Sequence, residues 1–306
     1  MIKLTYFTPA YNAEKTLPNL YQALCNQTIK DFVWLVVDDG SVDNTSALVR
    51  EYIEHADFSI VLFQQENGGK HRAYNKAIKE CNTELLCCVD ADFVLVENAT
   101  EKILNEWKNY AERTEVAGIV TPIWCKNSMT DLNQTKEYIG FSAKTPDIGR
   151  MPELYSKYGY HGETLYPFRT TVLKEYMFPD IPNEKFMTES TIYLPISTQY
   201  KVHWMNQCLA QSTYMEGGLS DRRFYNQANS PLSTMLFYKL SAQCHPSLIT
   251  RTMNCGCYYA WKKVFKLSET ADFRKYSLPF FERILGGILV PHYIRLFQNN
   301  IKKFLK

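Results

Sequence analysis

The first 125 residues alternate short, β-branched apolar runs with longer segments in which apolar residues recur every three or four positions. This alternation is typical of repeated βαβ units, in which helices connect neighbouring parallel strands. The sequence therefore predicts an α/β fold, Rossmann-like, with a mostly parallel sheet flanked by helices. The runs that predict strands are Ile2–Thr8, Val33–Asp38, Ser59–Gln64, Leu85–Val89 and Ala117–Trp124.

Polar residues follow several of these strands. Right-handed crossovers place the carboxyl ends of parallel strands at one edge of the sheet, where the ligands of open α/β sheets bind. We therefore expect these residues to lie close together and to bind a ligand. They are Pro9-Ala10-Tyr11-Asn12, Asp38-Asp39-Gly40-Ser41, Asn67-Gly68-Gly69-Lys70 and Asp90-Ala91-Asp92.

Three of these groups suggest particular chemistry. Asp90 and Asp92 are two positions apart, so strand geometry points both carboxylates to one side, where they could share a hard cation such as Mg²⁺ or Mn²⁺. Asp38 and Asp39 repel one another, and a turn needs only one of them, so we expect at least one to face a ligand. Gly68-Gly69 precedes a predicted helix, where backbone amides can approach an anion such as phosphate.

Composition excludes some partners. The 306 residues carry 34 Lys and Arg against 32 Asp and Glu, a formal net charge of +2. We therefore expect no nucleic-acid partner, since nucleic acid normally requires a concentrated basic face. Nine cysteines without a disulfide-like spacing indicate a reducing compartment. The N-terminus lacks a signal-peptide core and no run approaches about 18 apolar residues, which predicts a cytoplasmic protein.

Taken in order, the four polar groups resemble those of the family 2 inverting glycosyltransferases, which are nucleotide-diphospho-sugar transferases with the GT-A fold. The resemblance covers about residues 3 to 110. It implies that the donor substrate is a nucleotide-diphospho-sugar, with a UDP-sugar expected, and that the cofactor is Mn²⁺ or Mg²⁺. By analogy with other members of that family, the resemblance implies a saccharide or lipid-linked acceptor and a role in cell-surface polysaccharide synthesis.

The same resemblance implies roles for individual residues. Pro9, Tyr11 and Asp39 would hold the base and ribose, and Lys70 would lie near the pyrophosphate. Asp92 would bind the metal. The residues assigned to the donor are Pro9, Tyr11, Asn12, Asp39, Asn67, Lys70, Asp90 and Ala91, and those assigned to the metal are Asp90 and Asp92.

The second half carries fewer matching residues. Asn183–Ser190 is similar to the family segment that contains the acidic catalytic base, which makes Glu189 the expected base. The structural alternative is a glutamate favoured at a helix start by the helix dipole. Tyr214–Ser220 resembles a segment that closes the domain near the donor. Phe93 stands where many relatives have an acidic residue. The Gln-X-X-Arg-Trp motif of processive synthases is also missing, and this second departure favours transfer of one sugar at a time.

The domain organisation is expected to be uneven. We expect a catalytic domain over residues 1–220, with a nucleotide-sugar half (1–125) and an acceptor half (126–220), and a helical extension over 221–306. Within the acceptor half, residues 126–185 form a polar, Pro- and Gly-punctuated insert, which is usually functional.

Two later segments carry structural expectations. Thr188–Thr213 predicts a short helix followed by a strand. The aromatic-rich segment Leu278–Phe297 contains charges that argue against a membrane span. It is either a helix packed on the domain or an interfacial helix that makes peripheral contact with a membrane, and both interpretations stay open.

Two other functions are compatible with parts of the sequence. A sugar nucleotidyltransferase has a related sheet but normally carries a Gly-rich basic loop directly after the first strand, and Thr8–Lys15 contains no glycine. A non-catalytic or inactive nucleotide-sugar-binding module would be expected to lose some of Asp39, Asp92 and Glu189, which are all present. His161, within the insert, is a weaker candidate for contact with the acceptor.

Overall fold

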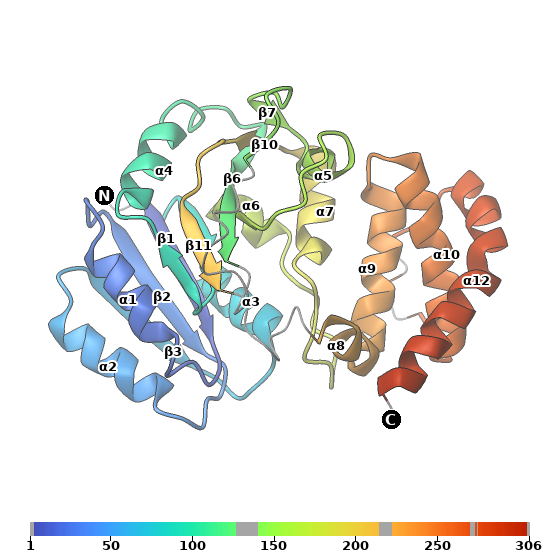
Figure 1. Ribbon diagram of the computed structural model, residues 1–306, viewed down its shortest axis with the longest axis horizontal. Coiled ribbons are helices and arrows are strands. Elements are labelled where there is room, and N and C mark those ends of the chain that lie inside the picture. The colour runs from blue at the N-terminus through green and yellow to red at the C-terminus, as the bar shows by residue number, and fades with distance from the viewer. Residues whose placement is uncertain (1–2, 127–139, 214–221, 270–272, 274, 305–306) are drawn as a thin grey trace. The chain divides into compact units, whose positions relative to one another are not determined.

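The computed structural model describes residues 3–126, 140–213, 222–269, 273 and 275–304. The chain forms two compact units (Figure 1): Met1–Met177 with Gln199–Glu216, and Phe178–Thr198 with Gly217–Lys306. Residues 178–198 thus group with the C-terminal helices. The catalytic domain expected over residues 1–220 stays a prediction, because compactness does not say which residues catalyse. The segment Tyr214–Ser220 and residues 127–139 of the insert lie outside the described residues.

The first unit is built around the predicted sheet. Its first half contains β1 (Leu4–Ala10), α1 (Leu17–Cys25), β2 (Phe32–Asp38), α2 (Thr45–His55), β3 (Ser59–Gln64), α3 (Lys70–Glu80), β4 (Leu85–Cys88), β5 (Phe93–Leu95) and α4 (Ala99–Trp107). Its second half contains β6 (Val116–Lys126), β7 (Ile148–Gly149), α5 (Met151–Ser156), β8 (Thr164–Leu165), β9 (Pro167–Arg169), α6 (Thr170–Glu175), β10 (Lys201–Trp204) and β11 (Ala210–Thr213).

The strand order confirms the α/β prediction. The sheet runs β3-β2-β1-β4-β9-β6-β10-β7, and its first four strands are all parallel. β9 then pairs antiparallel with both β4 and β6. All five expected strands are present, with ends within two residues of the expected ones, because each is a short, mainly apolar run. β1, β2 and β4 are largely buried, whereas β3 at the edge of the sheet is partly exposed.

Alternate residues of each strand pack under different helices. Tyr6 and Trp34 are in register and fully buried with the apolar faces of α1, α2 and α4. Phe7 and Leu35 point to the opposite face, where the Phe7 ring stacks on Tyr74 of α3 at 5.2 Å. Helices therefore cover both faces of the sheet, which leaves the strand ends as the open edge.

The segment after α7 (Ser190–Gln199) corrects one expectation. Instead of a helix and one strand, the structure has a helix and two strands, β10 and β11. Both lie parallel to the long strand β6: Trp204 pairs with Val120, and Ala210 pairs with Ile123. From Trp204 to Ala210 the chain advances six residues, whereas their partners on β6 are only three residues apart. Residues 205–209 therefore lie outside the regular β-ladder between β10 and β11.

The second unit is helical, as the sequence predicted for the C-terminal extension. It contains α7, α8 (Arg223–Asn229), α9 (Pro231–Cys244), α10 (Leu248–Val264) and α12 (Phe280–Phe304). Its core includes Leu236, Tyr258, Trp261 and Phe297, all at most 5% exposed. In the part of the chain that the structure describes, none of the helices combines the length and apolar character needed to span a bilayer.

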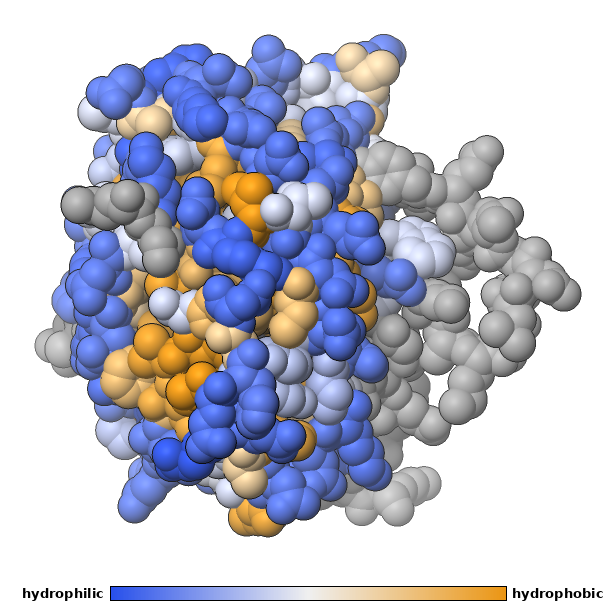
Figure 2. All heavy atoms as spheres, turned by 90° about the vertical axis from the view of Figure 1, so that its left-hand side faces the viewer, coloured by the Kyte–Doolittle hydropathy of each residue, from blue (hydrophilic) through white to orange (hydrophobic). Residues whose placement is uncertain are grey.

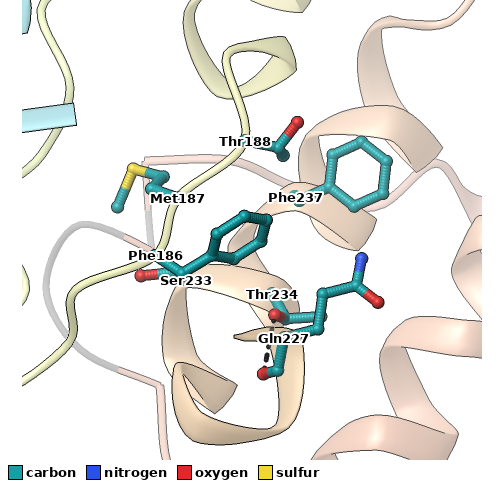
Figure 3. A pocket seen from close by; sticks show the side chains of 7 residues that line it. All are labelled: Phe186, Met187, Thr188, Gln227, Ser233, Thr234 and Phe237. Carbon is teal, nitrogen blue, oxygen red and sulfur yellow. Dashed lines mark hydrogen bonds between the residues drawn. The ribbon is translucent and has the colours of Figure 1, made fainter. Parts of the chain in front are cut away.

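The first turn of α9 is held by a residue that is distant in the sequence. The buried Glu184 carboxylate accepts hydrogen bonds from the backbone amides of Leu232 and Ser233, at 2.7 and 2.6 Å. Figure 3 shows the side chains around the adjoining gap, which has no room for a water molecule. This gap is therefore a packing defect and not a ligand pocket. It is lined by Phe186, Met187, Thr188, Gln227, Ser233, Thr234 and Phe237.

Candidate functional site

The ends of β1, β2 and β4 bring the predicted polar groups together in the first unit. Ala10 is paired with Asp38, and the Asp39 amide donates to the Ala10 carbonyl at 2.8 Å. On the other side of β1, the Val89 amide donates to the Phe7 carbonyl at 2.8 Å. The sheet order reverses direction between β1 and β4, which is the point where open α/β sheets bind ligands.

The Asp39 carboxylate organises the loop after β3. One oxygen accepts from the Gly68 amide and the Gln65 side chain, at 2.8 and 2.7 Å. The other accepts from the Gly69 amide at 2.7 Å and from Asn67 at 3.3 Å. The anion that the paired glycine amides approach in this structure is therefore the Asp39 carboxylate, which is 4% exposed. The role of Asp39 in holding the nucleotide stays a prediction.

Glycine is required at two turns beside this carboxylate. Gly40 has φ +78°, and a Cβ atom there would lie 2.7 Å from the Asn67 amide nitrogen. Gly69, at the N-cap of α3, has φ +95°. Both values lie in the region that side chains with a Cβ rarely adopt. Because of these turns, the loops after β2 and β3 approach one another closely.

Asn12 connects the loop after β1 to the loop after β2. Its amide donates to Ser41 Oγ at 2.9 Å, and its Oδ1 accepts from the Val42 amide at 2.9 Å. Asn12 has φ +50°, a conformation that asparagine tolerates better than most residues. In this structure Asn12 therefore shapes the site, and direct contact with the donor stays a prediction.

Two further aspartates fix the start of α2. Asp38 Oδ1 accepts from the Ser41 amide at 2.8 Å, and its Oδ2 accepts from the Ser46 hydroxyl. Asp43 accepts from the backbone amides of Thr45 and Glu14, at 3.0 and 3.2 Å. Burial acts to raise the pKa of Asp43, but the hydrogen bonds from Thr45 and Glu14 outweigh it, so the pKa is lowered. The ionised Asp43 carboxylate therefore satisfies the first backbone amide of α2.

The carboxylates after β4 lie beside a lysine. Lys70 Nζ, in the first turn of α3, is 2.7 and 2.8 Å from the two oxygens of Asp90. Burial, and then the negative charge of Asp90, raise the pKa of Asp92 to about 6, whereas Lys70 acts in the opposite direction. Lys70 thus neutralises one carboxylate and leaves the second with unbalanced negative charge.

Glu163 joins this group, and the sequence did not indicate it as a site residue. Its Oε2 accepts from Ser212 Oγ at 3.2 Å, and its charge adds to the effects that raise the pKa of Asp92. It lies directly before β8, which pairs antiparallel with β6. This long-range pairing has no local sequence signal, so the sequence alone does not place Glu163 beside Asp92.

The remaining predicted residues occupy varied positions. Tyr11 follows β1 and is 54% exposed, Pro9 is half-buried within β1, and Ala91 is half-buried against the sheet core. Glu189 belongs to the second unit, where its carbonyl accepts from the amides of Ile192 and Tyr193 at the start of α7. The roles given to these residues stay predictions.

The residues after β4 fit a divalent cation. Within the described ranges, no three His, Cys, Asp or Glu side chains are arranged as a metal-binding group. Two carboxylates, from Asp90 and Asp92, are nevertheless what Mg²⁺ or Mn²⁺ commonly takes from a protein when phosphate and water supply the other ligands. The unbalanced charge on Asp92 favours such a cation, because a cation offsets the same repulsion that raises its pKa.

Comparison with known proteins gives partial sequence matches. Poly-beta-1,6-N-acetyl-D-glucosamine synthase of Staphylococcus epidermidis is 27% identical over 135 residues, and that of Staphylococcus aureus (strain COL) is 29% identical over 135 residues. Each match covers 44% of this chain and 32% of the relative. The matched region therefore spans about a third of the length of these curated relatives.

Solved structures share the fold over most of the chain. S. aureus TarS 1-349 in complex with UDP-GlcNAc has a TM-score of 0.58 at 17% identity, covering 93% of this chain and 78% of that one. The mannosyltransferase PcManGT from Pyrobaculum calidifontis, in complex with GDP-Man and Mn²⁺, has a TM-score of 0.53 at 16% identity, covering 94% and 86%. These neighbours are GT-A glycosyltransferases, so the fold is of the GT-A type.

The family assignment rests on a model that covers more than half of the chain. The model described as "Glycosyl transferase family 2" matches residues 5–177. That range contains the four polar groups at the strand ends, the Lys70–Asp90 pair and Glu163. The protein is therefore a member of glycosyl transferase family 2.

Proposed function

We propose that this glycosyltransferase is metal-dependent and inverting, and that it moves one sugar from a nucleotide-diphospho-sugar, namely a UDP-sugar, to an acceptor hydroxyl. The observation that carries the proposal is the Lys70–Asp90 pair beside Asp92 at the junction of β1 and β4. The solved neighbours support the donor class, since TarS is described in complex with UDP-GlcNAc and PcManGT with GDP-Man and Mn²⁺.

The carboxylates and the lysine would act on the leaving group. Asp90 and Asp92 would hold Mn²⁺ or Mg²⁺, which when bound supplies Lewis-acid stabilisation of the charge that develops on the nucleotide diphosphate. The Lys70 ammonium, already fixed against Asp90, contributes a positive charge on the same side. Asp92 must be ionised to bind the cation, and its raised pKa of about 6 means that protons compete with the cation as the pH falls toward that value.

Glu189 would act on the acceptor. Its carboxylate would take the proton of the acceptor hydroxyl while that oxygen forms a bond to the anomeric carbon. The bond from this carbon to the diphosphate oxygen breaks, and its electron pair leaves with the nucleotide. Attack from the face opposite the leaving group inverts the anomeric centre. A general base of this kind typically contributes about 10² to 10⁴ in rate.

We propose a saccharide or lipid-linked acceptor, and a cytoplasmic role in cell-surface polysaccharide synthesis. The support comes from the partial match to the staphylococcal polysaccharide synthases and from the resemblance stated above. Because the sequence lacks the Gln-X-X-Arg-Trp motif of processive synthases, we expect one sugar to be added per reaction. Product chain length, measured by mass spectrometry, tests this point.

The function is tested by combining binding and turnover. The purified chain is offered UDP-glucose, UDP-galactose, their N-acetyl forms and GDP-mannose with Mn²⁺, and both nucleotide release and melting temperature are measured. Glu189→Gln should keep the donor-induced rise in melting temperature while transfer falls about 10² to 10⁴-fold. The matched control is Glu175→Gln, which changes an exposed glutamate at the end of α6 and should leave both readouts unchanged.

Each outcome has a distinct meaning. A melting shift without turnover for any donor would indicate a binding module instead of an enzyme. Near-normal turnover in Glu189→Gln would remove this residue from the mechanism. Absence of both a shift and nucleotide release, with all five donors, would contradict the proposed donor class.

A further inference from the structure

The nearly neutral chain consists of two parts of opposite charge. Residues 222–306 carry 14 Lys and Arg against three Asp and Glu, whereas residues 1–221 carry 20 against 29. The C-terminal helices are therefore strongly basic and the rest of the chain is acidic. An asymmetry of this size between parts of one chain suggests that the basic part meets an anionic partner.

The same helices expose most of the large apolar side chains. Of the 15 that are exposed among the described residues, nine lie on α10 and α12, and the five on the first unit are spread over separate elements. Figure 2, which faces the side where α1 and α2 lie, shows apolar areas bordered by hydrophilic side chains on that face. The eight that we call the α10–α12 apolar face are Leu248, Ile249, Met253, Phe280, Phe281, Ile284, Leu285 and Ile288.

The sequence spacing places these residues on one side of each helix. On α10, Ile249 and Met253 are one turn apart and are 73% and 47% exposed. On α12, Phe281, Leu285 and Ile288 lie within three successive turns and are 72%, 47% and 72% exposed. Positions three or four apart share a helix face, so each helix presents a continuous apolar stripe.

The two stripes adjoin because the helices are in close contact at this end. A Cβ atom on Gly286 would lie 2.8 Å from the Gly256 amide nitrogen and 3.0 Å from the Thr252 carbonyl oxygen. Arg251 Nε lies 2.7 Å from Glu282 Oε1 one turn earlier. Glu282 is the only acidic residue on the two helices and is 3% exposed, so no exposed negative charge interrupts the combined face.

Basic side chains lie within this face and farther along the same two helices. Arg283 lies among the apolar residues of α12, with its guanidinium 5.7 Å from the centre of the Phe280 ring. Arg295 is exposed three turns later, and Lys262 and Lys263 lie in the last turn of α10. Large exposed apolar groups bordered by Lys and Arg are the combination by which helices bind membrane surfaces that contain anionic lipids.

We propose that the α10–α12 apolar face docks on the surface of an anionic lipid bilayer. Apolar side chains enter the interface, and the positive charge of residues 222–306 is attracted to the lipid headgroups. A second copy of the chain is disfavoured as the occupant, because it would bring two strongly basic helical units together. The proposal goes beyond the proposed function, and its test needs no sugar transfer.

Co-sedimentation of the full chain with vesicles tests the proposal. We expect binding to phosphatidylcholine vesicles that contain about 30% phosphatidylglycerol, and binding at least about tenfold weaker to pure phosphatidylcholine. The double variant Phe281→Ser/Ile288→Ser should weaken binding to the anionic vesicles about tenfold or more. The matched control is Ile53→Ser/Val61→Ser, which changes exposed apolar residues of the first unit and should bind like the wild type.

The contrary outcomes are equally specific. No binding to anionic vesicles, or equal binding by wild type and the double variant, would overturn the proposal. Wild-type dimers in light scattering that become monomers in Phe281→Ser/Ile288→Ser, without vesicle binding, would assign the face to a second copy. Circular dichroism that matches the wild type verifies that each variant is folded. Because vesicle binding and nucleotide release are separate readouts, failure of this proposal is distinguishable from failure of the proposed function.

Discussion

Replacing Asp92 with asparagine should stabilise the metal-free protein at neutral pH. The pKa of Asp92 is raised from 3.8 to about 6, first by burial and then by the charge of Asp90. A carboxyl group with a raised pKa is less favourable in its ionised form in the folded chain than in the unfolded chain. Asparagine has nearly the same shape and no charge, so the variant removes this penalty.

The magnitude follows from the shift. A displacement of roughly two pKa units corresponds to about 3 kcal/mol at about 1.4 kcal/mol per unit, and partial exposure of the side chain reduces this to roughly 1 to 3 kcal/mol. The sign with pH is fixed by the direction of the shift. Because the folded-state pKa of Asp92 is the higher one, the penalty is fully present above about pH 6 and disappears as the pH falls toward 3.8.

Urea denaturation in the presence of EDTA measures the effect. Four of the five tryptophans, Trp34, Trp107, Trp124 and Trp204, lie in the first unit, so their fluorescence reports mainly its unfolding. At pH 7.5 we expect the free energy of unfolding of Asp92→Asn to exceed that of the wild type by roughly 1 to 3 kcal/mol, and at pH 5 the difference should be smaller.

A control and two outcomes complete the design. Asp57→Asn changes an exposed aspartate of the first unit, whose side chain is 69% exposed, and should alter stability little at either pH. If Asp92→Asn is no more stable than the wild type at pH 7.5, the unbalanced charge inferred at this position is wrong. A difference that stays constant between the two pH values would likewise exclude titration of Asp92 as its cause.

Three further substitutions test the loops and charges of the site. Gly69→Ala should lower the free energy of unfolding by about 1 to 3 kcal/mol in urea denaturation because φ is +95° there, whereas Gly68→Ala, where only a flexible side chain is crowded, should cost less. Asp39→Asn should cost about 2 kcal/mol and speed amide hydrogen exchange at both glycines, since it removes an acceptor that both amides use. Lys70→Met removes the partner of Asp90, and it should lower the transfer rate at saturating Mn²⁺ at least about tenfold in nucleotide-release assays. An unchanged rate would show that this lysine does not stabilise the charge on the leaving group.

The sheet of the first unit could be predicted because its signals are local. Each parallel strand is a short apolar run, and each is followed by polar residues that the parallel topology gathers at one edge. For the same reason the sequence predicts that Asp90 and Lys70 lie close together. Asp90 follows β4, and Lys70 begins α3, the helix that precedes β4. The ion pair between them agrees with that reasoning.

What the sequence did not predict depends on long-range contacts. The bonding of Asp39 to two glycine amides requires the close approach of two loops that are about 30 residues apart. Glu163 reaches the carboxylates through antiparallel pairing of β8 with β6, for which the short strand Thr164–Leu165 leaves no periodic pattern. The break between β10 and β11 is likewise set by the length of β6 and not by a turn motif in the sequence.

The apolar character of Leu278–Phe297 was visible in the sequence, but its exposure was not. Periodicity shows that one face of a helix is apolar, and only packing shows which residues are covered. In the structure Tyr293 and Phe297 are buried, whereas Phe281 and Ile288 are each 72% exposed. The structure therefore locates the candidate membrane contact at the first turns of α12 and adds α10 to it.

Inverting transfer from a nucleotide-diphospho-sugar leaves its mark on the anomeric configuration of the product, which NMR can assign. The chain is incubated with an α-linked UDP-sugar, Mn²⁺ and a saccharide acceptor, and the new linkage is assigned by NMR. We expect a β-linked product that forms with Mn²⁺ and is lost in Asp92→Asn and Glu189→Gln. An α-linked product, or transfer at the wild-type rate in either variant, would contradict it.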